Sequence, residues 1–513
     1  MSTQAWILTV FAVYFSLIIA LAIYFRKSKN MSDYYLAGRS LNTWVGALSA
    51  QTSDMSGWLL MGLPGAVWAA GFGGAWIAVG LIIGTVINWL FVAKKLRRYT
   101  IVANNSITLP EFLENRFRDK SHVLKTTAAV FFAIFFTLYA ASGFVAGGTL
   151  LPRIFDIGYH ASVLILAAFV VAYTLIGGLK AISWTDTIQG MLMFFAVLFL
   201  PLIVISTMGG WGEVMNAVDQ PGFFNLFSNA QGERIAAVSV ISGLAWGLGY
   251  FGMPHILIKL IAIKKEKYVN RSALIAIVWV VIALASAVLV GLVGRAFMPD
   301  LVIAETVFNM MVSSIFLHDG ASFGLVLLGA LFLCGMFAAI KSTADSQLLV
   351  GSSAVGDIYK NINKKASDNH MVWFSRGTVL VVALIALWIA IDAYDPALGG
   401  PNRNTGVMQL VAMAWSGFGA AFGPAVLTSL YWKRTNRAGA TAGIIVGGLT
   451  VLIWQYAPLM DGGTLLAGTG LLSIVPGFAL SLIAIIIGSL VTKAPSAEIL
   501  AEFETAKKPL IED

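Results

Sequence analysis

The stretch Ser49–Val67, SAQTSDMSGWLLMGLPGAV, decides the fold class, because it places a carboxylate and helix-breaking residues inside a long apolar segment. A charge at the centre of a bilayer costs about 2.5–3.5 kcal/mol on insertion scales. Gly57 and Pro64 loosen the same segment and free backbone groups. Transporters build ion and substrate sites from such broken helices, whereas the plainer interpretation is an Asp54 satisfied by a neighbouring helix. The stretch therefore predicts a site near the membrane midplane.

Composition places the whole chain in the membrane. It has 513 residues, of which 58% are hydrophobic and 11% charged, and its mean hydropathy is +0.83. A soluble domain of this size needs more charged surface. The net charge of +8 lies in loops between apolar runs and does not indicate nucleic acid. The single cysteine, Cys334, excludes an internal disulfide and a cysteine-based metal cluster.

Apolar runs of about 20 residues recur along the chain and predict an all-α polytopic membrane protein with about thirteen transmembrane helices. The predicted spans are 5–25, 45–70, 73–93, 125–150, 160–179, 187–208, 236–261, 273–296, 323–351, 372–392, 406–431, 438–457 and 468–491.

The basic residues predict the orientation. With the N-terminus outside and the C-terminus in the cytoplasm, most of the Lys and Arg residues fall in inner loops or the tail. We expect only Arg153, Arg234, Arg295 and Arg403 outside, and Lys341 as the one basic residue within a span.

A second polar cluster, GLAWGLGYFGMPHIL, spans Gly243–Leu257. Trp246 and Tyr250 are four residues apart and share a helix face, at a depth similar to that of Asp54. Pro254 removes a backbone donor beside them. These features favour an aromatic wall next to unwound backbone, although aromatic residues in a span are most often lipid-facing or packed in the core.

A third cluster, FAAIKSTADSQLL, spans Phe337–Leu349. Ala339, Ser342 and Thr343 lie on one helix face, where two hydroxyls and a carbonyl suit a small alkali cation. Hydrogen bonding of the hydroxyls to the preceding turn is the plainer alternative. In SWTDTIQG, Ser183–Gly190, Asp186 opens a span, where an acidic residue is often only a partner of the helix dipole.

These clusters together resemble the sodium:solute symporter family. The strings that match are SDMSGWLLMGLPGAV (53–67), SWTDT (183–187), WGLGYFG (246–252), PHIL (254–257) and QLLV (347–350). The resemblance implies a LeuT-type fold of two inverted five-helix repeats. The repeats would be 45–208 and 236–431, preceded by a helix and loop at 1–44 and followed by two peripheral helices at 432–491 and a cytoplasmic tail at 492–513.

The family's site residues transfer to matching positions. The resemblance implies sodium bound by the carbonyls of Thr52, Met55 and Ala339 and the hydroxyls of Ser342 and Thr343, with Asp54 supporting the bound ion. It implies that L-proline lies at Ser56 and Gly57, with its ring lined by Trp58, Tyr139, Trp246, Tyr250 and Pro254.

The chain departs from the family pattern at Met253, where we expect Gln, and at Lys341 and Asp345, where we expect uncharged residues. Lys341 and Asp345 are i, i+4 neighbours. Three readings stay open: the pair occupies, with Asp186 and Ser346, a place for a second sodium; it snorkels to the inner surface; or Lys341 makes transport partly proton-driven.

The expected function is sodium-coupled symport of L-proline into a bacterial cell across its cytoplasmic membrane, by alternating access. Pantothenate, a monocarboxylate or a sugar is the alternative substrate. We expect no enzymatic activity, since none of the five His residues is paired at i, i+4 as a metalloenzyme requires. The expected partners are L-proline, sodium as coupling ion and the lipid bilayer, with no further cofactor, nucleic acid or obligatory protein partner.

Overall fold

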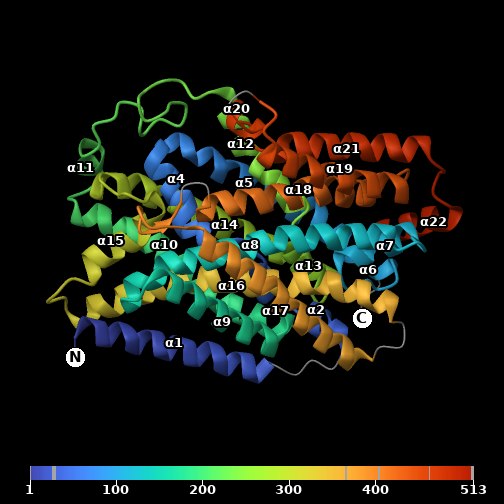
Figure 1. The fold of residues 1–513 in the computed structure, drawn as a ribbon, viewed down its shortest axis with the longest axis horizontal. Coiled ribbons are helices and arrows are strands. Elements are labelled where there is room, and N and C mark those ends of the chain that lie inside the picture. The colour runs from blue at the N-terminus through green and yellow to red at the C-terminus, as the bar shows by residue number, and fades with distance from the viewer. Residues whose placement is uncertain (1, 26–29, 364–366, 403–404, 461–462, 510–513) are drawn as a thin grey trace.

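The computed structural model describes residues 2–25, 30–363, 367–402, 405–460 and 463–509. The basic residues Arg26, Lys27, Lys364, Lys365 and Arg403, used above for the orientation, lie outside these ranges. The described chain is almost entirely helical, and most long helices lie roughly side by side along the long axis of the molecule (Figure 1).

The elements follow the chain in this order. The first half holds α1 (Thr3–Phe25), α2 (Met31–Leu36), η1 (Ala37–Arg39), α3 (Thr43–Asp54), η2 (Trp58–Gly62), α4 (Leu63–Ala70), η3 (Phe72–Ala75), α5 (Trp76–Ile87), η4 (Asn88–Ala93), α6 (Lys94–Val102), α7 (Leu109–Phe117), α8 (Val123–Phe155), α9 (Tyr159–Gly177), α10 (Leu179–Thr207) and α11 (Trp211–Asn216). The second half holds α12 (Ala237–Ala245), η5 (Trp246–Phe251), α13 (Pro254–Ile261), α14 (Glu266–Phe297), η6 (Ala304–Thr306), α15 (Val307–Phe316), α16 (Phe323–Ile362), α17 (Asp368–Asp392), the short antiparallel strands β1 (Tyr394–Asp395) and β2 (Gly400–Pro401), α18 (Val407–Tyr431), α19 (Arg437–Tyr456), α20 (Leu465–Thr469), α21 (Ile474–Val491) and α22 (Ala497–Lys507).

The predicted fold class is confirmed, but thirteen continuous spans are not found. Within the described residues, 11 helices are long and apolar enough to cross a membrane, and one bent pair raises the number to 12. The predicted span 45–70 accounts for much of the difference, because it is broken into pieces that are individually too short.

The break in that span falls at Asp54. Asn42 caps the N-terminus of α3 by accepting a 3.0 Å hydrogen bond from the Val45 N–H. The helix then ends at Asp54, and the chain resumes as the π-helical turn η2, followed by α4. Gly65 permits α4 to pack closely, since a Cβ there would lie 3.0 Å from the backbone of Ala304 and Glu305. The glycines and proline therefore open the helix where the sequence predicts.

A second break lies between α12 and α13, whose axes differ by 45°. Trp246–Phe251 form the 3-10 helix η5, Met253 is extended and Pro254 begins α13. A Cβ on Gly249 would lie 2.0 Å from the indole nitrogen of Trp415, so only glycine lets α18 approach η5. Both broken helices pack against the long helices of the core: α3 contacts α10, α13 and α16, and η5 contacts α18.

Most described residues of the C-terminal tail are exposed, but one face of its helix docks on the helical bundle. In the tail, α22 packs against α6, and Phe503 is buried against Tyr99 with ring centroids 6.1 Å apart. Arg98 donates a 2.5 Å hydrogen bond to the carbonyl of Lys507, near the C-terminal end of α22. The helix adds a docked cap to this end of the bundle, beside α6 and α7 (Figure 1).

Candidate functional site

Hydroxyl and carbonyl oxygens meet where α16 crosses the end of α3. The hydroxyls of Ser342 and Thr343 lie 3.3 Å and 3.4 Å from the carbonyl oxygen of Thr52. Ser342 also donates to the carbonyl of Ala339 at 3.2 Å, which is the local hydrogen bond of the plainer alternative. The contact with a different helix shows that local bonding is not the whole role of these hydroxyls. Four oxygens thus gather within the protein, a donor set that hard cations prefer.

The fifth predicted sodium ligand, Met55, directly follows the last residue of α3 and is buried. Helix α10 packs so closely on this cluster that a Cβ on Gly190 would lie 2.0 Å from the Thr52 hydroxyl. That hydroxyl is buried and makes no hydrogen bond with any described residue. All five predicted sodium ligands therefore lie at or beside one junction of α3, α10 and α16.

Asp54 lies next to this oxygen cluster and is completely buried. Tyr250 donates a 2.5 Å hydrogen bond to its Oδ2, and the indole of Trp58 donates to its backbone carbonyl at 3.1 Å. Its Oδ1 accepts no hydrogen bond, and no described basic side chain forms an ion pair with it. A buried carboxylate of this kind is costly unless a cation or a proton accompanies it.

The predicted aromatic residues surround the two helix breaks. The rings of Trp58 and Trp246 have centroids 6.5 Å apart, and Tyr250 meets Trp415 edge-on at 5.1 Å. Trp415 of α18 also donates a 2.7 Å hydrogen bond to the carbonyl of Trp246, which fixes the indole against η5. Trp415 was not predicted from the sequence, because α18 is continuous and no helix break marks the residue.

The remaining predicted substrate residues share this region. Ser56 and Gly57 fill the gap between α3 and η2, and the Trp58 N–H lies 3.4 Å from the Ser56 hydroxyl. The hydroxyl of Tyr139 is buried and has no hydrogen-bond partner among the described residues. Since buried hydroxyls are normally paired, this orphan is a candidate contact for a bound solute. Pro254 begins α13 on the other side of the second break.

A cavity of about 640 Å³ has Trp246 in its lining. Its lining includes Gly73 of η3, Trp76 at the start of α5, Ser239 of α12, and Glu233 and Arg234 from the segment before α12. An apolar cavity with a few polar groups, ending at an aromatic wall, has the character of a small-molecule access route.

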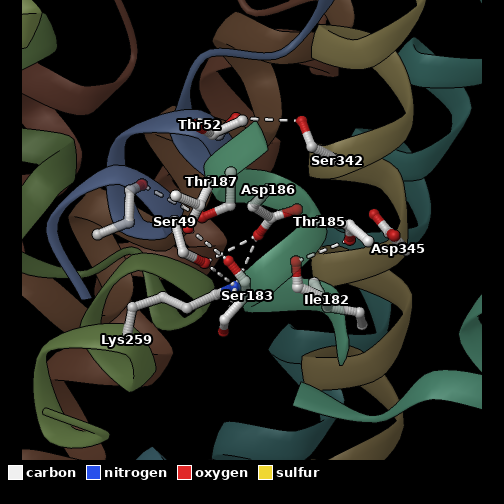
Figure 2. A network of polar contacts seen from close by, with 12 residues as sticks. Ser49, Thr52, Ile182, Ser183, Thr185, Asp186, Thr187, Lys259, Ser342 and Asp345 are labelled. Atoms are coloured by element: carbon white, nitrogen blue, oxygen red, sulfur yellow. Dashed lines mark hydrogen bonds and ion pairs between the residues drawn. The ribbon is translucent and has the colours of Figure 1, made fainter. Parts of the chain in front are cut away.

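Below the oxygen cluster in Figure 2, Lys259 of α13 connects its own helix with α3 and α10. Its ammonium lies 2.9 Å from Asp186 Oδ2 and donates to the hydroxyl of Ser49 at 2.7 Å. Ser49 in turn donates to the same Asp186 oxygen at 2.9 Å, and all three side chains are fully buried. Asp186 is therefore one member of a charge pair, and it does not open its span as expected, because α10 already begins at Leu179 and has no acidic residue in its first turn.

Lys259 corrects the expectation that Lys341 is the one basic residue within a span. Lys259 lies two residues beyond the PHIL string and near the predicted end of its span. This position predicts a residue of the inner loops. The break at Met253 bends α13 back into the protein, which brings the side chain to Asp186 instead of the membrane surface. A lysine within an apolar run was the signal that the sequence offered.

Lys341 forms the predicted pair with Asp345, with its Nζ 2.7 Å from Asp345 Oδ2. The same ammonium lies 3.2 Å from the centroid of the Tyr173 ring, a cation–π contact from α9. Both charged side chains are completely buried, so Lys341 does not snorkel to the inner surface. Ser346, on the next turn of α16, is also buried, and its hydroxyl makes no hydrogen bond among the described residues.

The sodium:solute symporter family model matches residues 34–447. The chain is 42% identical to a high-affinity proline transporter of Bacillus subtilis over 93% of its length and 96% of that protein. It is 41% identical to a sodium/proline symporter of Escherichia coli over 99% of its length and 97% of that protein.

Among solved structures, a Na⁺-coupled sialic acid symporter in a substrate-bound outward-open state resembles this fold with a TM-score of 0.72. It is 18% identical in sequence, and the match covers 96% of this chain and 99% of that one. At this identity the likeness concerns the fold alone.

Proposed function

The chain belongs to the sodium:solute symporter family, and on that premise we propose that it transports L-proline into the cell together with sodium, by alternating access. It is a helical membrane protein with the LeuT-type fold, and its family and relatives are transporters, not enzymes. Sodium is the coupling ion. The substrate assignment rests on relatives named for proline transport, which are 40–42% identical over nearly the full chain.

The single observation in the structure that carries the proposal is the contact of the Ser342 and Thr343 hydroxyls with the Thr52 carbonyl beside Asp54. In this arrangement sodium binds between α3 and α16, through the oxygens of Thr52, Met55, Ala339, Ser342 and Thr343. Asp54 supplies the negative charge that offsets the ion. Asp54 also accepts a hydrogen bond from the hydroxyl of Tyr250, so the ion site and the solute site share one carboxylate.

Proline then occupies the space between the two helix breaks. Its carboxylate meets the backbone around Ser56 and Gly57, where α3 has ended and backbone N–H groups are available. Its ring contacts Trp58, Tyr139, Trp246, Tyr250 and Pro254. Binding sodium and proline at adjacent breaks lets each stabilise the same arrangement of the helices, which is the physical origin of coupling.

We place the N-terminus outside and the C-terminus in the cytoplasm of a bacterial inner membrane, with repeats at 45–208 and 236–431. In support, the basic helix α6, which carries two lysines and two arginines, lies at the same end of the molecule as the docked tail helix α22 (Figure 1). The cavity beside Trp246 would then be the outer access route.

Transport by the purified protein in proteoliposomes tests the assignment. An inward sodium gradient is expected to drive accumulation of radiolabelled L-proline, and a potassium gradient is not. Competition with unlabelled pantothenate, pyruvate, lactate and glucose identifies a different substrate. Sodium-driven uptake of one of these, without uptake of proline, would overturn the substrate assignment and leave the family intact.

A further inference from the structure

The buried charges of α3, α10 and α16, which meet at the proposed ion site, and of the neighbouring α13 nearly balance. Among the described buried residues of α3, α10, α13 and α16, the charged side chains are Asp54, Asp186, Lys259, Lys341 and Asp345. Lys259 neutralises Asp186 at 2.9 Å, and Lys341 neutralises Asp345 at 2.7 Å. Asp54 alone remains without a basic partner. One negative charge is therefore left for mobile cations in this part of the protein.

The two charge pairs belong to one cluster. Asp186 lies on α10, which packs along α16, and Lys341 interacts electrostatically with Asp186 as well as with Asp345. Figure 2 shows Asp186 between Lys259 and Asp345, below the contact between Thr52 and Ser342. The cluster therefore adjoins the proposed sodium site.

The cluster also contains oxygens that accept no hydrogen bond from the described residues. Asp186 Oδ1, Asp345 Oδ1 and the Ser346 hydroxyl are buried and accept no hydrogen bond from the described residues. Two carboxylates and a hydroxyl are ligands that a hard cation prefers. The ammonium of Lys341 lies beside these oxygens, where it pairs with Asp345. It also contacts the ring of Tyr173 on α9.

A free cation added to this cluster would leave it with an excess positive charge away from water. Such a charge is strongly disfavoured, since burial removes the hydration of an ion without supplying an anion in return. Removal of the ammonium would have the opposite effect, because it would leave the Asp345 carboxylate without a counter-charge, beside oxygens that accept no hydrogen bond from the described residues. The lysine thus decides whether the oxygens bind a free ion.

We propose that Lys341 is a built-in counter-ion whose ammonium takes the place of a second monovalent cation, so that the protein moves one sodium ion with each solute molecule. The inference rests on the proposed sodium-coupled transport and adds its stoichiometry. It assigns the single mobile sodium to Asp54 and the oxygens around Thr52, and it closes the Asp186–Asp345 cluster to sodium.

The first test counts bound ions without any solute. Radioactive sodium binding to the purified protein in detergent is expected to saturate at one ion per wild-type chain and at two per Lys341→Met chain. Methionine keeps the length and apolar stem of lysine and removes the charge. The matched control is the double variant Lys341→Met with Asp345→Asn, which removes one charge of each sign and is expected to return to one ion.

The second test measures flux. Parallel uptake of labelled sodium and labelled proline is expected to give a ratio of one in the wild type and in the double variant, and a ratio near two in Lys341→Met. A sodium activation curve steeper than that of the wild type is expected in the single variant alone. If Lys341→Met does not fold, Lys341→Gln, which is also neutral but keeps a polar end, replaces it in both tests with the same expected counts and ratio.

Two bound sodium ions in the wild-type chain would overturn the inference. An ion count of one in all three proteins would also overturn it, because the unpaired carboxylate would then not attract a cation. A failure of the proposed function would give a different result. The ion counts would then be as expected, but a sodium gradient would not drive proline uptake.

Discussion

The hydrogen bond from Tyr250 to Asp54 provides a sharp test of how the ion and solute sites are joined. Tyr250→Phe removes one oxygen and keeps the ring that faces Trp415 at 5.1 Å. The 2.5 Å bond to Asp54 Oδ2 is lost, and Oδ1 has no donor to compensate among the described residues. We therefore expect the change to act on sodium binding, because in the proposed site the ionised form of Asp54 offsets the charge of the ion.

The magnitude follows from the difference between two kinds of hydrogen bond. A bond to a charged group contributes about 1.5–3 kcal/mol, and a bond between neutral groups about 0.5–1.5 kcal/mol. Losing the bond therefore raises the cost of the ionised carboxylate relative to the protonated one by about 1–1.5 kcal/mol. That difference corresponds to an increase of about 5- to 12-fold in the sodium concentration that gives half-maximal transport.

The assay is sodium-dependent proline uptake in proteoliposomes, measured at saturating proline for the sodium constant and at saturating sodium for the proline constant. Tyr139→Phe is the matched control, since it removes a hydroxyl that makes no hydrogen bond with the described residues. We expect this control to raise the proline constant more than the sodium constant. A Tyr250→Phe protein with an unchanged sodium constant and a raised proline constant would refute the reasoning, because the hydroxyl would then serve the solute.

Four other substitutions test three separate parts of the structure. Thr343→Ala and Ser342→Ala each remove an oxygen that lies within 3.4 Å of the Thr52 carbonyl, so each should raise the sodium constant more than the proline constant; equal shifts of both constants would contradict a direct ion contact. Trp246→Ala deletes an indole in the aromatic wall and should raise the proline constant about tenfold or more, as loss of a few kcal/mol of apolar contact requires; an unchanged constant would assign the ring to packing. Asp119 lies outside the spans, where burial by itself raises its pKa but hydrogen bonds from the residues after it and from Arg437 outweigh burial and lower the pKa. Its stabilising contribution is therefore present above the unfolded pKa of about 4 and lost as the pH falls through the lower folded value; thermal unfolding of detergent-solubilised Asp119→Asn should show a smaller loss of stability below about pH 4 than the wild type, and parallel curves would contradict this account.

Much of the site followed from local sequence. The break at Asp54 was predictable because Gly57 and Pro64 weaken a helix wherever they lie. The face formed by Ala339, Ser342 and Thr343 was predictable because helical spacing alone brings them together. The pairing of Lys341 with Asp345 followed from the same spacing, and the 2.7 Å contact confirms it.

Contacts between distant segments were not predictable in this way. Trp415 lies 169 positions from the Trp246 carbonyl to which it donates, and nothing near Trp415 in the chain marks the partner. The tail helix α22 carries mixed charges that suit water, yet Phe503 is buried because α6 offers it an apolar surface.

By itself, the sequence determined that this chain lies in a membrane, that its second and seventh predicted spans are broken, and which polar residues are buried among apolar ones. These properties depend on hydropathy and on backbone preferences that act over a few residues. Only the tertiary structure decided which of the buried charges are neutralised. Lys259 reaches Asp186 because the bend before α13 turns its side chain inward, whereas the Asp54 carboxylate accepts a hydrogen bond from the Tyr250 hydroxyl and has no basic partner among the described residues. Charge compensation depends on distances of a few ångströms between different helices, and such distances are set by packing and not by position along the chain.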